Sequence, residues 1–203
     1  MMKTVAGPDG KPRCGWCSNV EAFFPYHDNE WGYPVADDRT LFEKLCLESF
    51  QSGLSWRTIL TKRENFRRAF RYFDFNQVAE FTEQDVERLL QDEGIIRHRG
   101  KIEAVINNAK RAQELVAREG SIAAYVWQFE PLKECAAQSQ TTSDESVALA
   151  KALKKQGWKF VGPTTVFAFM QAMGLVNDHL EACVMRNKVA QARAEFKRPK
   201  SRT

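Results

Sequence analysis

The sequence predicts an all-α fold, and three observations support this prediction. Apolar residues recur at intervals of three and four positions along most of the chain, which is the period of an amphipathic helix. Helix-capping residues and glycine stops separate these apolar stripes. No stretch shows a convincing two-residue alternation of apolar and polar residues, as a half-buried strand would. With 203 residues, the chain can form one large domain or two small ones around a sizeable core.

A helix over residues 38–52 is the element around which we expect the rest of the chain to be organised. Asp37 and Asp38 lie before its first apolar residue, as helix N-terminal residues should. Gly53 ends the helix, and Ser55 can cap the helix that follows.

One face of this helix carries Leu41, Leu45 and Glu48, whose spacing places them on the same side. The stripe that should be buried therefore contains a carboxylate, and Trp56 follows a few residues later. An acid on an apolar face close to a Trp indicates a pocket. The alternative is that Glu48 lies near a fraying helix end and is hydrated, since charged residues are rarely fully buried.

Further helices are predicted in order along the chain. Their expected inward-facing residues are Trp56, Ile59 and Leu60, then Phe66, Ala69, Phe70 and Phe73, then Val86, Leu89 and Leu90, then Ile102, Val105, Ile106 and Ala109, then Ile122, Val126 and Phe129. Thr82 and Asp85 resemble a capping box at the start of the third group, and Gly94 ends it. Gly120 ends the fourth group, and Ser121 caps the fifth.

The last third of the chain begins with a polar loop over residues 130–143. A helix over residues 144–156 follows, and Pro163 can occupy the first turn of the next helix. Asn177 can cap a last short helix. The expected inward-facing residues of the first two helices are Val147, Ala150 and Leu153, then Val166, Phe167, Met170 and Met173.

The N-terminal part shows neither helical nor strand periodicity. Residues 1–12 contain two glycines and two prolines, which predicts a loose leader. Residues 14–32 are rich in polar and aromatic side chains. We therefore expect an ordered loop that is held by something other than regular structure.

The net charge of +4 is unevenly distributed. Residues 188–203 hold six basic residues against one acid, so we expect this tail to be a disordered basic arm. Two further basic clusters lie within residues 57–71 and 97–111. Each can be a solvated helix face, and two of them near aromatic residues would also suit a phosphate backbone.

Composition also limits where the protein acts. No apolar run approaches the roughly 20 residues that a membrane span needs. The first residues lack a signal-peptide pattern, so we expect a cytoplasmic protein that does not bind membranes. The cysteine count of five is odd and follows no regular framework. Thiols or metal ligands are therefore expected rather than disulfides.

Four residues have the character of a metal site. His179 and Cys183 are four positions apart, so they would point from the same face of the last short helix. Cys14 and His27 lie near the N-terminus, and two Cys with two His match a closed tetrahedral zinc site. Cys17 is a rival ligand to Cys14, because the two form a C-x-x-C pair. The alternative is a buried free thiol beside a capping histidine.

The connection over residues 94–101 indicates an anion site. Two short helices joined by a turn between Gly94 and Gly100 can present backbone N–H groups at the N-terminus of the second helix. Arg97, Arg99 and Lys101 add positive charge. A helix-hairpin-helix that holds a DNA strand by its phosphates has this form, and so does an ordinary connection with surface arginines.

Several aromatic residues surround the Glu48 region. Trp16, Tyr26, Trp31 and Trp56 can be simple core residues. A flat heterocycle stacked between rings and hydrogen-bonded to a carboxylate would use the same residues.

Five strings of the sequence resemble the bacterial 3-methyladenine DNA glycosylase I family. The strings are Cys14-Gly-Trp, Tyr26-His-Asp-Asn-Glu-Trp-Gly, the run from Glu48 through Gln51 to Gly53-Leu-Ser-Trp, Gly94-Ile-Ile-Arg-His-Arg-Gly-Lys, and Gly174-Leu-Val-Asn-Asp-His. They are long and rare, they occur in the right order, and the resemblance extends from about residue 13 to residue 183.

The resemblance implies the helix-hairpin-helix DNA glycosylase fold with a subdomain, formed by the two chain ends, that zinc ties together. We expect a domain over 13–189, with the helix-hairpin-helix part at 38–159 and the zinc-tied part at 13–37 and 160–189. Residues 1–12 and 190–203 are then flexible termini. The implied ligands of a structural Zn²⁺ are Cys14, His27, His179 and Cys183.

The resemblance also assigns roles within the pocket. Glu48 corresponds to the pocket carboxylate and is the catalytic-site residue. Tyr26 and Trp56 correspond to rings that sandwich the base. Trp16 and Trp31 correspond to further pocket aromatics.

The hairpin residues Gly94, Arg97, Arg99, Gly100 and Lys101 are expected to contact DNA. Leu54, which is apolar and follows Gly53, is a candidate to fill the gap left by a flipped nucleotide.

The implied activity is hydrolysis of the N-glycosidic bond of 3-methyladenine in alkylated double-stranded DNA, for base-excision repair. The resemblance implies a bacterial monomer that acts on the nucleoid. Two alternatives stay open: a bifunctional glycosylase/lyase that uses Lys101 as a Schiff-base amine, and a zinc-stabilised DNA-binding module without catalysis. The sequence departs from the family pattern at Ser49, Phe50 and Ser52, which we expect to reshape the pocket floor and the range of bases accepted.

Overall fold

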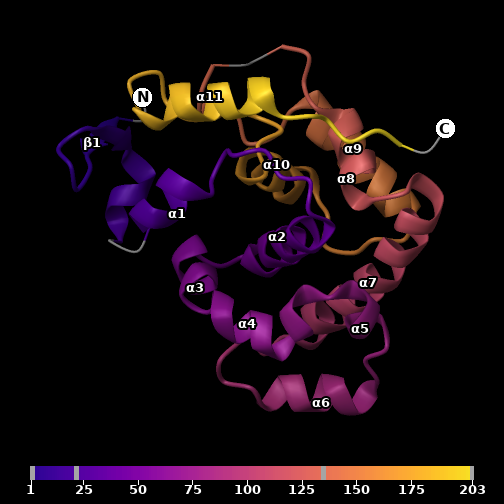
Figure 1. Cartoon of the computed structure of the whole chain (residues 1–203). Helices are drawn as coiled ribbons and strands as arrows, with labels where there is room; N and C mark the ends of the chain where they lie inside the picture. Colours follow the sequence, from indigo (N-terminus) through magenta and orange to yellow (C-terminus); the bar gives the residue numbers. More distant parts are fainter. Residues whose placement is uncertain (1–2, 21–22, 134–135, 202–203) are drawn as a thin grey trace.

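A computed structural model of the chain describes residues 3–20, 23–133 and 136–201, and it is mainly helical (Figure 1). The predicted all-α class is therefore correct for most of the chain. The elements are β1 Thr4–Ala6, β2 Pro12–Cys14, η1 Gly15–Asn19, α1 Phe23–Asn29, α2 Asp38–Gln51, α3 Trp56–Thr61, α4 Arg63–Ala69, η2 Arg71–Phe73, α5 Phe75–Ala79, α6 Glu83–Gln91, α7 Arg99–Glu119, α8 Ile122–Val126, η3 Trp127–Phe129, α9 Asp144–Lys155, α10 Pro163–Ala172 and α11 Met185–Glu195.

Helix α2 lies in the middle of the molecule, between the N-terminal segment and α10 on one side and α3, α4 and α5 on the other (Figure 1). Its predicted start is confirmed, because the Asp37 side chain accepts a hydrogen bond from Thr40 N at 2.8 Å. Leu41 and Leu45 are buried, as their shared face predicted. Ser55 caps α3 by accepting from Thr58 N at 3.2 Å, so the turn between α2 and α3 is short and well defined.

The hairpin elements α6 and α7 begin with side-chain caps. Thr82 and Asp85 form the predicted capping box of α6, and Ser121 caps α8 as expected. The N-cap of α7 is His98, whose Nδ1 accepts from Lys101 N at 3.2 Å. Gly120 ends α7 with a positive φ of 93°, a conformation that glycine adopts without strain.

The N-terminal residues differ from the sequence prediction. Strands β1 and β2 pair in antiparallel register, with Thr4 opposite Cys14, so residues 4–12 are not part of the loose leader that we expected for residues 1–12. Segment 14–32 contains η1 and α1 instead of being a loop without regular structure. These elements were not predicted because strands of three residues are too short to show alternation.

Helix α5 and the outer face of α9 also differ from the prediction. Helix α5 was not predicted, and it packs on α7. In α9, Val147 is 46% exposed, and Leu149 is buried with Ala150 and Leu153 instead. An apolar stripe of three residues leaves the orientation of a helix uncertain by one position.

The prediction for the C-terminal part is wrong in two respects. Residues 177–184 are not helical, so His179 and Cys183 do not share a helix face. Residues Met185–Glu195 form α11, which includes the first half of the segment 188–203 that we expected to be a disordered arm. The Phe196 ring packs on Trp127 at a centroid distance of 4.6 Å, which fixes the chain beyond the helix.

Glu130 anchors this C-terminal segment. Its carboxylate accepts hydrogen bonds from Arg193 at 2.9 Å and from Arg198 at 2.8 and 2.9 Å. Burial raises the pKa of the Glu130 carboxyl, but hydrogen bonds from Arg198 and Arg193 outweigh burial and leave the pKa below its usual value. The basic residues of the tail are therefore partly engaged by the protein itself.

The two chain ends lie side by side. Val184 N, just before α11, donates to Pro12 O in β2 at 3.0 Å. In Figure 1, α11 lies on the side of the N-terminal segment, and the hairpin helix α6 lies at the opposite end of the molecule. Among the described residues, no helix combines the length and the apolar composition that crossing a membrane requires.

We expect Glu130→Gln to release residues 193–201 from the body of the protein, because an amide cannot pair with two guanidinium groups. Limited trypsin digestion should cut the variant after Lys197 or Lys200 several times faster than the parent. Folding lowers the pKa of Glu130. Its contribution to the free energy of unfolding is therefore fully present above the usual pKa of a glutamate and is lost as the pH falls through the lowered pKa of the folded state. Glu195→Gln is the matched control, and equal cleavage rates in both variants would contradict the assignment.

Candidate active site

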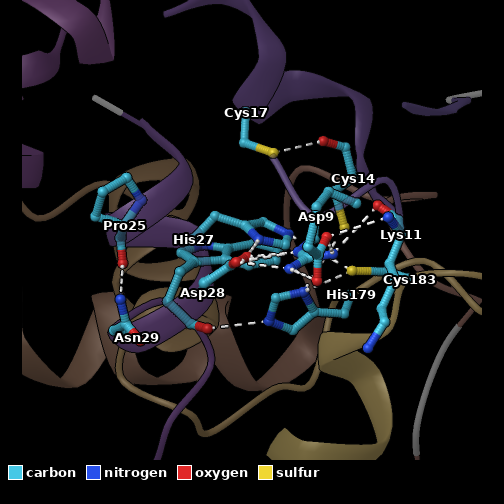
Figure 2. Close-up of polar contacts among 12 residues, drawn as sticks. Asp9, Lys11, Cys14, Cys17, Pro25, His27, Asp28, Asn29, His179 and Cys183 are labelled. Carbon is cyan, nitrogen blue, oxygen red and sulfur yellow. Dashed lines mark hydrogen bonds and ion pairs between the residues drawn. The ribbon is translucent and has the colours of Figure 1, made fainter. Parts of the chain in front are cut away.

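Cys14, His27, His179 and Cys183 converge in the interior although they come from opposite ends of the chain. All four are buried, and their ligand atoms lie within 4.8 Å of one another. Sγ of Cys14 lies 3.7 Å from Nδ1 of His179, and Sγ of Cys183 lies 3.6 Å from the same nitrogen and 3.7 Å from Nε2 of His27. Figure 2 shows the four side chains pointing toward one another.

These separations fit a tetrahedral metal ion. Zinc–sulfur and zinc–nitrogen bonds of about 2.3 and 2.05 Å at a tetrahedral angle place sulfur and nitrogen about 3.6 Å apart. A hydrogen bond from Cys14 lowers the pKa of the Cys183 thiol, and His179 and His27 act in the same direction. The group can therefore supply a thiolate and two imidazole nitrogens to a metal ion.

Neighbouring groups orient both histidines. Nδ1 of His27 lies 2.7 Å from Oδ1 of Asp28, and Arg13 holds the same carboxylate at 2.9 Å, so Nε2 of His27 is directed at the cluster. Nε2 of His179 lies 3.0 Å from the carbonyl oxygen of Trp31, which directs its Nδ1 at the two sulfurs. Such outer partners commonly fix the tautomer of a metal-binding histidine.

Cys17 lies outside this group. Its Sγ donates to the carbonyl oxygen of Cys14 at 3.0 Å, and Figure 2 shows the sulfur directed at that oxygen, apart from the four converging side chains. Of the two cysteines that the sequence offered, the geometry favours Cys14.

A cavity of about 270 Å³ opens beside the Cys14–His27–His179–Cys183 group. Its walls come from η1, α1, α2, α3 and α10, together with the segments around residues 31, 138–140 and 178. The lining residues are Trp16, Tyr26, Trp31, Glu48, Gln51, Trp56, Gln138, Gln140, Ala168, Gln171 and Asp178. All five predicted pocket residues, the four rings and Glu48, are therefore brought together.

A second cavity, of about 500 Å³, lies between residues 131–133 and 136–143, the start of α9, α10 and residues 175–178. It is larger, but Phe167 is its one aromatic lining residue among those described. We take the smaller cavity as the candidate site, because rings and a buried charge converge there.

Glu48 is 6% exposed, so it is not the hydrated end of a helix. Its Oε1 forms an ion pair with Nζ of Lys44 at 2.9 Å, one turn earlier in α2. Glu48 lines the cavity, and Lys44 does not.

Lys44 is the main residue of the site that sequence reasoning missed. The side chain is buried, and Nζ donates to the Tyr26 hydroxyl at 2.5 Å and lies 3.6 Å from the centroid of the Trp56 ring. Burial lowers the pKa of the Lys44 ammonium, while the Glu48 carboxylate opposes that change. The available signal was the four-residue spacing from Glu48, which permits an ion pair on one helix face.

Tyr26 and Trp56 do not form an open sandwich in this structure. Their ring centroids are 5.4 Å apart and the planes are inclined by 45°. A flat base between them would need a gap of about 7 Å, twice the optimum carbon–carbon contact distance. The predicted stacking roles therefore require the rings to separate or the base to stack on one ring.

Other lining residues supply polar atoms that the sequence did not identify. Gln138 N donates to Oδ1 of Asp178 at 2.7 Å, which holds residue 138 at the cavity. Burial raises the pKa of the Asp178 carboxyl. Within the described residues, Oε1 of Gln138 and Nε1 of Trp56 are buried without a hydrogen-bond partner. One acceptor and one donor are thus left for a ligand.

Ser49, Phe50 and Ser52, at which the sequence departs from the family pattern, do not line the cavity. Phe50 is fully buried, 4.6 Å from the Phe66 ring, and Ser49 Oγ donates to the Phe160 carbonyl oxygen at 3.0 Å. The three residues therefore do not form the floor of the cavity, contrary to our expectation.

The hairpin residues have different environments. Lys101 is 7% exposed, and its Nζ donates to the carbonyl oxygens of Phe50 at 2.9 Å and Ser52 at 2.5 Å. This corrects the expectation that its ammonium faces a phosphate. Arg99 pairs with Glu83 at 2.5 Å and also contacts Glu87 on α6, whereas half-exposed Arg97 lies 3.6 Å from Glu93.

The remaining hairpin candidates, Gly94 and Gly100, lie close to side chains of neighbouring residues. Gly94 N donates to Oδ1 of Asp92, and a Cβ at residue 94 would lie 3.1 Å from Asn65. Gly100 lies in the first turn of α7 beside the His98 ring. Leu54 is 40% exposed on the α2–α3 turn, which Lys101 connects to α7 through Ser52.

Comparison with known proteins reveals extensive similarity. The sequence profile of the methyladenine glycosylase family matches residues 16–187. The chain is 50% identical to DNA-3-methyladenine glycosylase 1 of Escherichia coli (strain K12), over 84% of this chain and 95% of the relative.

Solved structures agree with this similarity. A crystal structure of 3-methyladenine DNA glycosylase I superposes with a TM-score of 0.80 at 51% identity, covering 85% of this chain and 98% of that one. A tyrosine-to-phenylalanine variant of such an enzyme, in complex with 3-methyladenine, also gives a TM-score of 0.80, at 38% identity, covering 86% and 97%.

We expect the purified protein to contain one bound metal ion per chain, which native mass spectrometry can count. Cys14→Ser should lose the ion, because serine replaces a ligand sulfur. Cys17→Ser should retain it, because the Cys17 sulfur faces a carbonyl oxygen. The reverse pattern would make Cys17 the ligand, and a parent protein without metal would contradict the site itself.

Proposed function

This chain belongs to the methyladenine glycosylase family, and from that premise we propose that it excises 3-methyladenine from alkylated DNA. The reaction is hydrolysis of the N-glycosidic bond of a nucleotide flipped out of the duplex. The observation that carries the proposal is the buried Glu48 carboxylate in a cavity enclosed by four aromatic rings.

The chemistry of the lesion fits such a site. Methylation at N3 places a positive charge on adenine and weakens the bond to the sugar, so the base departs neutral without strong acid catalysis. We propose that Glu48 accepts a hydrogen bond from the 6-amino group of the base. Guanine presents an oxygen at that position, and two acceptors would face each other in a desolvated pocket.

Two further groups support recognition by hydrogen bonding. Oε1 of Gln138 can accept from an amino group, and Nε1 of Trp56 can donate to a ring nitrogen. Stacking on Trp56 or Tyr26 would favour a cationic base by about 0.5–2 kcal/mol. Water then attacks C1′ of the sugar.

We propose that the Cys14–His27–His179–Cys183 group holds a structural Zn²⁺. Two sulfurs and two nitrogens are the donor set of closed zinc sites, which leave no position for a catalytic water. The group would fix the segment that carries Trp16, Tyr26 and Trp31, because His179 also contacts the Trp31 carbonyl oxygen. Its role in the reaction is therefore to shape the cavity.

The hairpin is the proposed DNA-binding element. Gly100 allows a phosphate to approach the N-terminus of α7, whose first N–H groups point outward, and Arg97 adds an exposed positive charge. Leu54 lies on the neighbouring turn, where it can enter the gap that a flipped base leaves. Arg99 can join these contacts if it exchanges the α6 carboxylates for phosphate.

Lys101 is not proposed as a nucleophile. A Schiff-base amine must reach C1′ of the sugar, whereas Nζ of Lys101 is buried and engaged by two carbonyl oxygens. Borohydride trapping of a covalent protein–DNA adduct would restore the glycosylase/lyase alternative. A DNA-binding module without catalysis would need neither a ring-lined cavity nor a buried carboxylate.

The proposed function predicts that the parent protein releases 3-methyladenine from duplex DNA treated with dimethyl sulfate, as measured by chromatography of the released bases. Glu48→Gln should fold and retain metal but bind free 3-methyladenine at least about tenfold more weakly, since the amide replaces an ionised acceptor by a neutral one. Glu145→Gln is a control outside the cavity. Equal affinity of the parent and Glu48→Gln for the base would remove Glu48 from recognition.

The hairpin assignments predict different effects for two basic residues. Arg97→Ala should weaken duplex binding for all sequences and reduce the slope of log affinity against log salt by about 1. Lys101→Met should leave that slope unchanged and lower the free energy of unfolding by about 1–3 kcal/mol, because two carbonyl oxygens lose a charged donor. Binding titrations at several salt concentrations measure the slope, and urea unfolding measures the free energy of unfolding. If Lys101→Met reduced the slope and Arg97→Ala left it unchanged, Lys101 would be the phosphate contact and Arg97 would not.

A further inference from the structure

Lys44 lies directly behind the wall of the cavity. Its Nζ contacts three groups that line the cavity: Oε1 of Glu48 at 2.9 Å, the Tyr26 hydroxyl at 2.5 Å and the Trp56 ring at 3.6 Å. Lys44 itself is not a lining residue, and it is 2% exposed. A bound base would therefore lie within one layer of atoms of a buried positive charge without touching it.

The charges around Lys44 make this position unusual. Glu48 is its direct partner, and Glu30 and Arg63 act on it from farther away. Arg63 pairs with Glu43 at 2.7 Å and with Glu30 at 2.6 Å, and Arg67 also pairs with Glu43 at 3.0 Å. Two cations and two anions therefore compensate one another. The Glu48–Lys44 pair is then neutral as a unit, and the cavity presents a base with a carboxylate that is already balanced.

This balance matters because the charge of the base changes during the reaction. The 3-methyladenine base is cationic while it is attached to the sugar. When the C1′–N9 bond breaks, its electron pair goes to N9, the base becomes neutral and the positive charge moves to the sugar. Water then adds to C1′ and loses a proton to solvent, which completes the hydrolysis.

We propose that Lys44 is a positioning and specificity-determining residue whose ammonium disfavours positive charge on the bound base and so promotes its transfer to the sugar. The inference rests on the proposed glycosylase function and deepens it. A charge that destabilises the bound substrate more than it destabilises the transition state lowers the activation barrier and raises the rate of the chemical step. Lys44 lies behind the base pocket, so its repulsion falls mainly on the base and less on the sugar.

The same placement sets a ligand preference. With Lys44 present, the pocket should bind a neutral N3-alkylated adenine at least as well as a cationic one. Without Lys44, Glu48 is unbalanced and a cation on the same rings gains both a carboxylate partner and cation–π contacts. The chemical class that distinguishes the two states is the N-alkylated purine cation.

The first experiment measures ligand affinity by calorimetry in mildly alkaline buffer, in which 3-methyladenine is neutral and 3,9-dimethyladenine is a permanent cation. The parent should not prefer the cation. Lys44→Met should shift the affinity ratio toward the cation by about tenfold, a modest value for one unit charge at this range in a partly desolvated site. Lys151→Met, which removes an exposed charge on α9, should leave the ratio unchanged.

Lys44→Gln separates charge from hydrogen bonding. The glutamine amide can still donate to Glu48 or Tyr26, but it carries no charge. If Lys44 only holds Glu48 in place, this variant should behave as the parent, and that result would overturn the proposal. A shift similar to that of Lys44→Met supports it. If neither variant folds, a parent protein that prefers the cation by tenfold or more overturns the proposal, and one that does not supports it.

The second experiment measures base release from methylated duplex DNA. Lys44→Met should lower kcat by about tenfold and lower KM as well, so that kcat/KM changes little, which is the signature of relieved ground-state destabilisation. A merely structural role predicts a higher KM or an unchanged kcat, and either result contradicts the inference. Failure of the parent to release 3-methyladenine would instead refute the proposed function.

Discussion

The convergence of Cys14, His27, His179 and Cys183 is the constraint on which the rest of the site depends. The segment that carries three of the cavity rings contains only a short 3-10 helix and a two-turn helix, which are too short to be stable alone. Its position follows from contacts with the far end of the chain, through the four ligands and the bond from Val184 to Pro12. Because His179 also contacts the Trp31 carbonyl oxygen, this group of four residues and the cavity wall form one connected unit.

Helix α2 provides the second fixed reference, and its end explains the position of Lys101. The last carbonyl groups of a helix have no partner within the helix and carry partial negative charge. The Lys101 ammonium satisfies the carbonyl oxygens of Phe50 and Ser52, which joins the first turn of α7 to the end of α2. The turn that bears Leu54 and the hairpin therefore keep a fixed relation to Glu48, as an enzyme that holds DNA and extracts a base requires.

Local signals predicted much of this molecule. The α2 boundaries, the Thr82–Asp85 capping box and the buried Glu48 follow from periodicity and capping, which act within a few residues. The four predicted ligands do converge, but the basis of the prediction was incorrect, since His179 and Cys183 lie in an irregular segment rather than on one helix face. The inward position of Lys101 and the docking of α11 depend on contacts with residues such as Phe50 and Glu130, which are distant in sequence. No local pattern encodes such contacts.

The Lys44–Glu48 pair shows why the interior of the site is difficult to predict from composition. Both side chains are almost fully buried, and removing two charges from water costs free energy that their attraction repays only in part. The fold alone would be served as well by two apolar residues on this face of α2, which already packs Leu41 and Leu45 in the core. A buried ion pair that contacts two cavity rings is therefore better explained by the charge of the ligand than by stability. The base carries a positive charge before the glycosidic bond breaks and none afterwards. A Glu48 carboxylate whose charge is balanced by Lys44 can accept a hydrogen bond from the amino group of both the cationic and the neutral base, without holding the cationic base more tightly.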